Sequence, residues 1–355
     1  MADRKTLGQF LERAISDDAS PSPELRTLLL DLAGACKTIA RRLAEAPLRT
    51  GGAQGTAAVD SHGMKRFSAS AKGDVLSIGD SRRFWIARLR SRACAEQQPK
   101  ACHLYRGRLQ AVLLPLDRPS NAEVNAPGAT IFSVLRTEAP GHSFVDNGVQ
   151  RPGRALVCSG YAIHGPSLVL VLAIGQSVQA FALDRQKDEF VLTNPDIRIP
   201  AATDRIAIDA SRARFWTPPI RRYVDECLAG ETGPRGKDFR MHWLGSMAAE
   251  AHRILTCGGV FVCPGRGRMV GQPPQPWLLQ EANPISFVIE RAGGRSSTGT
   301  ARILDIGSGV PPSRPALIFG SSEEVERLET YHGGNEAASY DAPLFGQRGL
   351  FRSSV

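Results

Sequence analysis

One stretch, residues 111–136, constrains the fold more than any other part of the chain. It opens with an apolar run, passes into a loop marked by proline, asparagine and glycine, and returns to a second apolar run that ends at Arg136. Apolar runs of this length between turn residues predict buried strands. A loop held at both ends by core strands is a common place for binding and catalytic residues, so we expect this loop to carry the chemistry.

The composition is that of a soluble globular protein with one large domain or two moderate ones. The chain has 355 residues, of which 42% are hydrophobic and 22% charged. Its apolar runs are shorter than the roughly 18–20 residues that span a bilayer, and its first residues lack the apolar core of a signal peptide. We therefore expect a cytoplasmic protein without a membrane partner.

The net charge limits the kinds of partner to expect, and the cysteine pattern bears on disulfides and zinc. The formal charge of +9 fits either nucleic acid or an anionic small molecule. The sequence contains no nucleic-acid-binding motif, so we expect no nucleic-acid partner. The seven cysteines are scattered and form no C-x-x-C pair. This pattern favours reduced thiols and argues against a zinc site.

Hydrophobic periodicity predicts helices at the start of the chain and an antiparallel meander after the central loop. The first helix covers residues 5–16, and the second begins at the capping residue Ser22 and runs to about residue 46. A loop at 47–72 and an arginine-rich helix to about residue 91 come next. Three further strands are expected at 167–174, 178–183 and 189–193.

The second half alternates strands with helices. Strands are expected at 205–209 and 260–263, and helices at 218–228, 247–257 and 281–292. Gly258 should stop the helix at 247–257, and Ser321 with Glu324 should form a capping box that opens the last helix. A change in composition at 198–203 suggests two subdomains, 1–200 and 201–332, followed by a polar tail at 333–355.

Several strings together resemble the class I fructose-1,6-bisphosphatases over residues 5–332. The family pattern D-P-L-D-G-S-S-N is matched by LPLDRPSN at 114–121, and its G-T-I-F by ATIF at 129–132. GSM at 245–247, EANPISF at 281–287, ILDI at 303–306 and IFGS at 318–321 follow in the family's order.

The resemblance implies a layered α-β-α-β-α sugar-phosphatase fold, with two subdomains that contain mixed sheets. It implies hydrolysis of fructose 1,6-bisphosphate to fructose 6-phosphate and phosphate, in gluconeogenesis or the Calvin cycle. Mg²⁺ would be the cofactor, a sugar phosphate the ligand, and a homotetramer or dimer the assembly.

The residues that match the family's metal site are incomplete. Mg²⁺ needs oxygen ligands, and Glu96, Asp117 and Glu281 match family carboxylates. Gln97 replaces the second glutamate of a pair, and Glu96 and Gln97 would position the attacking water. Leu114 replaces the first aspartate of the D-P-L-D motif and offers no oxygen, so this ligand position is lost.

The substrate and regulatory positions have also changed. Pro119 has no N–H to offer an anion, while Asp117, Arg118 and Ser120 remain in the phosphate loop. Arg118 adds a phosphate contact or is simply solvated. The family's sugar-phosphate positions are here Asp209, Trp243, Cys263 and Gln275, and its AMP region contains Arg26, Arg108 and Arg136.

Three functional hypotheses follow, and plainer structural roles stand beside them. Asp117 could be a loop cap and Glu281 a helix cap. Because the site positions depart while the scaffold strings match, the leading hypothesis is a family member whose turnover is weak or absent. The second is a pseudo-phosphatase that binds a sugar phosphate or nucleotide, or assembles with an active paralogue. The third is a phosphatase for another sugar or inositol phosphate.

Overall fold

The structure is a computed structural model, and it describes most of the chain. The described residues are 4–16, 23–49, 102–106, 109–118, 121–122, 124–136, 152–265, 276–307 and 314–334. The expected arginine-rich helix lies outside them, as does Glu96. No helix among these described ranges is long and apolar enough to cross a membrane.

Two helices form the outer layer at the N-terminal end. Helix α1 (Leu7–Ser16) and helix α2 (Pro23–Arg49) pack against each other and against one face of the larger sheet. Leu11, Leu25 and Leu28 are fully buried in this contact, which confirms the apolar stripes expected from the sequence.

The larger sheet has seven strands, each antiparallel to the next, in the order β1 to β7. Its strands are β1 (Cys102–Arg106), β2 (Leu109–Leu114), β3 (Gly128–Arg136), β4 (Leu156–His164), β5 (Leu168–Ile174), β6 (Ser177–Asp184) and β7 (Glu189–Asn194). The expected meander is confirmed. Both faces of this sheet are buried, because its side chains alternate between two apolar cores.

The smaller sheet has five strands in the order β11-β12-β10-β8-β9 and is mixed. Strand β10 is parallel to β8 and β8 to β9, whereas β12 is antiparallel to β10 and β11. The strands are β8 (Arg205–Ile208), β9 (Arg240–His242), β10 (Val260–Cys263), β11 (Arg295–Ser297) and β12 (Leu317–Gly320).

The helices of the second half lie on both faces of this smaller sheet. They are α5 (Pro218–Leu228), α6 (Met247–Cys257), the π-helix η6 (Leu278–Ala282), α7 (Asn283–Arg291) and α8 (Ser322–Gly333). Short 3-10 helices complete the chain: η3 (Gly153–Ala155), η4 (Ala210–Phe215), η5 (Gly230–Thr232) and η7 (Ile303–Asp305).

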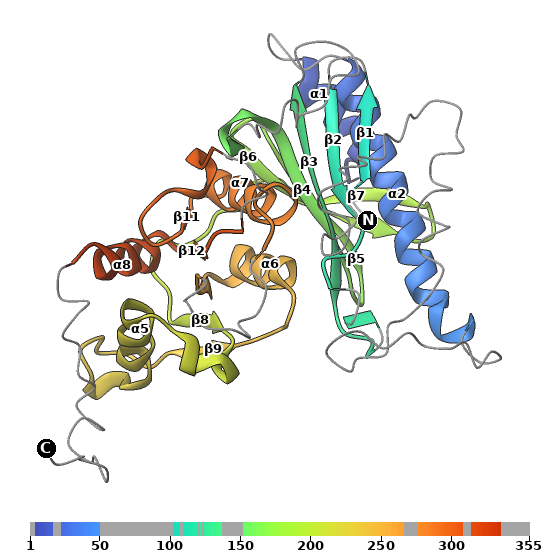
Figure 1. Ribbon diagram of the computed structural model, residues 1–355. Helices are drawn as coiled ribbons and strands as arrows, with labels where there is room; N and C mark the ends of the chain where they lie inside the picture. The colour runs from blue at the N-terminus through green and yellow to red at the C-terminus, as the bar shows by residue number, and fades with distance from the viewer. Residues whose placement is uncertain are drawn as a thin grey trace, which may run out of the picture.

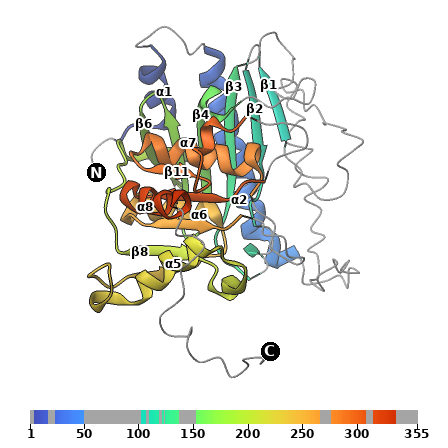
Figure 2. The same ribbon diagram turned by 60° about the vertical axis from the view of Figure 1, so that its left-hand side comes forward.

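These elements stack in five layers, α-β-α-β-α (Figure 1). Helices α1 and α2 cover one face of the larger sheet, α6 and α7 lie between the two sheets, and α5 and α8 cover the far face of the smaller sheet (Figures 1 and 2). The layered fold class expected from the resemblance is confirmed.

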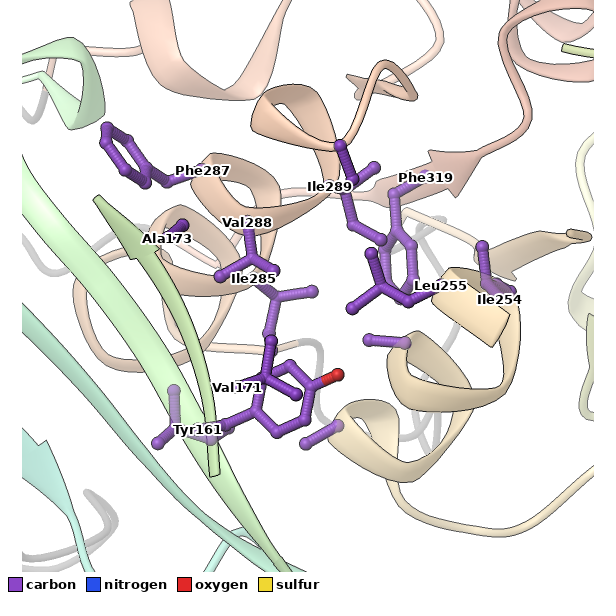
Figure 3. Close-up of a cluster of buried hydrophobic side chains, with 14 of the residues drawn as sticks. Tyr161, Val171, Ala173, Ile254, Leu255, Ile285, Phe287, Val288, Ile289 and Phe319 are labelled. Carbon is purple, nitrogen blue, oxygen red and sulfur yellow. The ribbon is translucent and has the colours of Figure 1, made fainter. Parts of the chain in front are cut away.

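The central core lies between the two sheets, around α6 and α7. Figure 3 shows Tyr161 and Val171 of the larger sheet facing Ile285 and Val288 of α7, with Phe319 of the smaller sheet on the other side. Because this core is continuous, it joins the two sheets into one packed body and fixes α6 and α7 relative to the loop after β2.

Two local predictions had different outcomes. Gly258 caps α6 as expected: its φ is 73°, and its N–H donates to the carbonyl of Ile254 at 2.8 Å. The capping box at the last helix is wrong. The Ser321 side chain makes no capping bond and instead accepts from the N–H of Gly259, while Glu324 turns inward.

Glu324 turns inward because it is the centre of a buried polar network. Both of its carboxylate oxygens accept from Nη2 of Arg235 at 2.6 Å, and one accepts from the Tyr223 hydroxyl at 2.7 Å. Both side chains of the Arg235–Glu324 pair are 3% exposed. The Arg235 guanidinium also lies over the Phe239 ring. This network ties the segment before β9 to α5 and α8.

Breaking this pair should destabilise the fold strongly. Arg235→Met leaves the Glu324 carboxylate buried without its main partner, so we expect the free energy of unfolding to fall by about 3–5 kcal/mol. Arg198→Met is the control: Arg198 pairs with Asp196 at 3.0 Å, but both side chains are at least half exposed. That variant should lose less than about 1 kcal/mol in urea unfolding. Equal losses in both would contradict the prediction.

Candidate functional site

The candidate site is centred on Asp117, three residues after the end of β2. Its main chain is paired with the start of β3, since its N–H donates to the carbonyl of Ala129 at 2.9 Å. Its Oδ1 accepts from the N–H of Ala129 at 2.8 Å, and its Oδ2 from the Ser246 hydroxyl at 2.6 Å. Asp117 thus links the larger sheet to the start of α6.

The start of α6 explains why a carboxylate is stable here. Ser246 is the N-cap of α6 and accepts from the N–H of Ala249 at 3.1 Å. The N–H of Ala248 points to Asp117 Oδ2 at 3.5 Å. A helix N-terminus presents unpaired N–H groups and partial positive charge, which favours an anion. Burial nevertheless raises the pKa of Asp117, against the lowering effect of these hydrogen bonds and of Arg118.

The loop that carries Asp117 is hydrogen-bonded to the residues at the start of β3. The Thr130 hydroxyl donates to the carbonyl of Pro115 at 2.7 Å and lies 2.8 Å from Nε2 of His164. Because the hydroxyl proton is used on Pro115, His164 must donate from Nε2. The Asn121 side chain donates to the carbonyl of Pro127 at 2.7 Å. Hydrogen bonds therefore hold described residues before and after Asp117 in the chain, at Pro115 and at Asn121.

Leu114 belongs to the central core. It is the last residue of β2, is 2% exposed, and packs with residues of η6 and α7 in the core between the sheets. Strand alternation puts it on the face of the sheet that α6 and α7 cover, the same side as the candidate site. At this position the structure therefore has an apolar side chain and no oxygen ligand.

Glu281 lies close to Asp117 and has an unusual ionisation. Its Oε2 accepts from the N–H of Trp277 at 2.7 Å, so it caps the π-helix η6 that leads into α7. This is the plainer helix-capping role considered above, although the helix begins three residues earlier than expected. The pKa of Glu281 is raised to about 7, mainly by burial and also by the charge of Asp117, against the lowering effect of the Trp277 hydrogen bond and of the charges of Arg118 and Arg314.

Two more residues predicted from the sequence, Arg118 and Asp209, lie near these carboxylates. Arg118 is exposed, and its positive charge lowers the pKa values of Asp117, Glu281 and the Cys263 thiol, so this charge lies near the site. Asp209 also acts on Cys263, whose pKa burial raises to about 12. Asp209 itself caps η4 by accepting from Ser211.

Trp243 lies on the smaller sheet side, just after β9. Its ring is 45% exposed and stacks on Phe261 with 6.1 Å between ring centroids and 9° between the planes. Phe261 stacks in turn on Phe319 at 4.8 Å. Trp243 therefore offers a flat apolar surface where the resemblance places a sugar-phosphate contact.

The donors that are described do not fit a two-metal centre. Asp117 and Glu281 are two carboxylates near each other, but Leu114 adds none, and within the described ranges no group of three or more His, Cys, Asp or Glu could hold a metal ion. Glu96 and Gln97, which would have to complete such a centre, lie outside the described residues.

The other predicted site residues are separate or not described. Ser120, Gln275 and Arg108 lie outside the described residues. Arg26 of α2 forms an ion pair with Glu12 of α1, and Arg136 is exposed at the end of β3. The regulatory role of these arginines stays a prediction.

Two residues of the site were missed from the sequence. Ser246 could have been found, since a serine before a helical pattern signals an N-cap, but its bond to Asp117 depends on the tertiary fold. Arg314 had no sequence signal. Its guanidinium carbon lies 3.5 Å from the centroid of the Trp277 ring, next to Glu281.

Removing the Ser246 hydroxyl should destabilise the chain. Ser246→Ala loses both the cap of α6 and the bond to Asp117, so we expect the free energy of unfolding to fall by about 1–2 kcal/mol. Thr217→Ala is the control, because Thr217 is the N-cap of α5 but makes no capping bond, and its buried hydroxyl has no partner. It should unfold at nearly the wild-type urea concentration. A similar loss in both variants would exclude the proposed bond.

Glu281 should make stability depend on pH. Its pKa is about 7 in the folded chain against an ordinary 4.5, so the folded state keeps a proton that the unfolded state releases between these values. Stability should therefore fall as pH rises through this window and level off above it. With EDTA present, the wild type should lose about 2 kcal/mol more than Glu281→Gln between roughly pH 5 and 7.5 in urea unfolding. Parallel pH profiles would contradict this.

Comparison with protein families gives two matches that together cover almost the whole described chain. Residues 5–195 match the fructose-1-6-bisphosphatase N-terminal domain, and residues 199–333 match the fructose-1-6-bisphosphatase C-terminal domain.

Individual relatives are similar to this chain in sequence over nearly its full length. The chain is 42% identical to "Fructose-1,6-bisphosphatase class 1" of Hydrogenophilus thermoluteolus, over 100% of this chain and 99% of the relative. It is 41% identical to "Fructose-1,6-bisphosphatase class 1 3" of Methylibium petroleiphilum, over 98% of both chains. Among solved structures, Leishmania major fructose-1,6-bisphosphatase in holo form aligns with a TM-score of 0.71 and 24% identity, over 92% of this chain and 98% of that one. This likeness shows the fold.

Proposed function

Because the chain belongs to the fructose-1,6-bisphosphatase class 1 family, we propose that it binds a sugar phosphate at the site around Asp117 and that its own hydrolysis of fructose 1,6-bisphosphate is weak or absent. The observation that carries the second half is the burial of Leu114 in the central core. A leucine there supplies neither charge nor coordination where the family motif has an aspartate.

The binding half of the proposal rests on the charges and shape of the site. The charge of Arg118 acts on Asp117 and Glu281, the N–H of Ala248 in the first turn of α6 points to Asp117, and Trp243 offers a ring for a sugar. Helix N-termini and arginines are the common phosphate-binding elements of proteins. Any residual turnover would need Glu96, Asp117 and Glu281 as Mg²⁺ ligands, with Gln97 beside the water.

The proposal includes the wider expectations of the resemblance. The protein would act in the cytoplasm, in gluconeogenesis or the Calvin cycle. It would assemble as a homotetramer or dimer, and each chain would consist of two subdomains that meet near residue 200. In the alternative hypothesis, a pseudo-phosphatase without activity of its own, the chain would bind a sugar phosphate or nucleotide or assemble with an active paralogue.

A phosphate-release assay tests the turnover. Purified protein with fructose 1,6-bisphosphate and Mg²⁺ should give a kcat/KM at least about 100-fold below that of the Hydrogenophilus thermoluteolus relative assayed in parallel, because ligand-shell losses alone cost about 10–100-fold. Turnover equal to that of the relative would overturn the proposal. Rapid turnover of another phosphate ester, in a panel that includes inositol phosphates, would favour the hypothesis of a phosphatase for another sugar or inositol phosphate.

Restoring a carboxylate at Leu114 tests the cause. Leu114→Asp should gain Mg²⁺-dependent thermal stability and phosphate release relative to Leu114→Asn, which has a similar size but no charge. Both variants place a polar group in the core, so both should melt below the wild type. If Mg²⁺ raises the melting temperature of both equally, the loss of the carboxylate is not the cause of weak turnover.

A further inference from the structure

Arg314 approaches the candidate site from a segment that is far from it in sequence. It lies just before β12, whereas Trp277 precedes η6 and Arg118 follows β2. The Arg314 guanidinium lies over the Trp277 ring, 3.5 Å from its centroid. A guanidinium stacked on an aromatic ring uses its flat face, and its N–H groups point outward in its own plane.

The ring that holds Arg314 is itself fixed to the site. The N–H of Trp277 donates to Glu281 at 2.7 Å, so the residue under the guanidinium is bonded to one of the two central carboxylates. Among the described residues, the charges of Arg314 and Arg118 both lower the pKa of Glu281. Positive charge from two separate segments therefore acts on one carboxylate.

The charge of the site makes these arginines necessary for binding an anion. The charge of Asp117 acts on Glu281, and the charges of Glu281 and Asp209 act on Cys263, so acidic groups lie near one another here and, when ionised, would repel a phosphate ester. The N-terminus of α6 contributes only partial charge. Arginine provides full charge and donors spaced to bond two phosphate oxygens at once.

We propose that Arg314, held on the Trp277 ring, is a phosphate-contacting residue of this site and acts with Arg118 to bind the phosphate ester. The inference deepens the proposed function and rests on it, because it assigns the phosphate of that sugar phosphate to a particular pair of side chains. Trp277 is then a positioning residue that sets where the guanidinium lies.

The alternative is a purely structural Arg314 that stabilises Trp277 and the start of η6. The two roles differ in what a lysine can do. Lysine keeps the charge but cannot stack flat or bond two oxygens in a fixed geometry. A structural role changes stability, whereas a binding role changes the affinity for phosphate.

The test is isothermal titration of the full chain with inorganic phosphate and, separately, with fructose 1,6-bisphosphate. Arg314→Gln should weaken both by about 10-fold or more, Arg314→Lys by less, and Trp277→Leu should weaken them although the arginine is kept. Arg198→Gln is the control, because Arg198 is an exposed arginine paired with Asp196, and it should bind as the wild type does. Urea unfolding of each variant separates affinity from stability.

The outcomes separate the inference from the proposed function. If the wild type binds fructose 1,6-bisphosphate and Arg314→Gln binds it equally well, the role of Arg314 is overturned and the proposed function stands. If the wild type binds neither probe, the proposed function fails and the inference fails with it. If Arg314→Gln does not fold, Arg314→Lys decides: affinity equal to that of the wild type overturns the inference.

Discussion

Helices α6 and α7 lie between two sheets, and the rest of the structure depends on the burial of both their faces. Ile254, Ile285 and Val288 meet side chains from the larger sheet or the smaller one (Figure 3). A helix covered on both sides cannot turn or slide without opening a cavity, because protein interiors are closely packed. The N-terminus of α6 is therefore held at a fixed place, beside the loop after β2.

This fixed place makes a site out of residues that are far apart in the chain. Ser246 and Asp117 are separated by 129 positions, yet their side chains lie 2.6 Å apart. Burial raises the pKa values of Asp117 and Glu281, so ionising both carboxyl groups at once is energetically unfavourable. Arg118 and Arg314 are the cations of the described residues whose charges offset part of this effect at Glu281.

Much of the fold could be predicted from the sequence, and part of the site could be. The strand pattern around Asp117, the meander and the glycine stop of α6 depend on local periodicity and backbone freedom. Asp117 and Glu281 were found through motifs. The capping box at Ser321 was wrong because Glu324 had a stronger partner in Arg235, which lies 89 positions away. A rule that considers only neighbours in sequence cannot include that competition.

The sequence by itself determined which strand faces are apolar, roughly where most of the helices lie, and that Leu114 can offer no ligand to a metal. Only the tertiary structure decided that Asp117 bonds to Ser246 and that Arg314 lies on Trp277 beside Glu281. The physical reason is the range of the forces. Alternation and capping act within one or two turns of chain, whereas burial and Coulomb interactions depend on distances that exist only once the layers have packed.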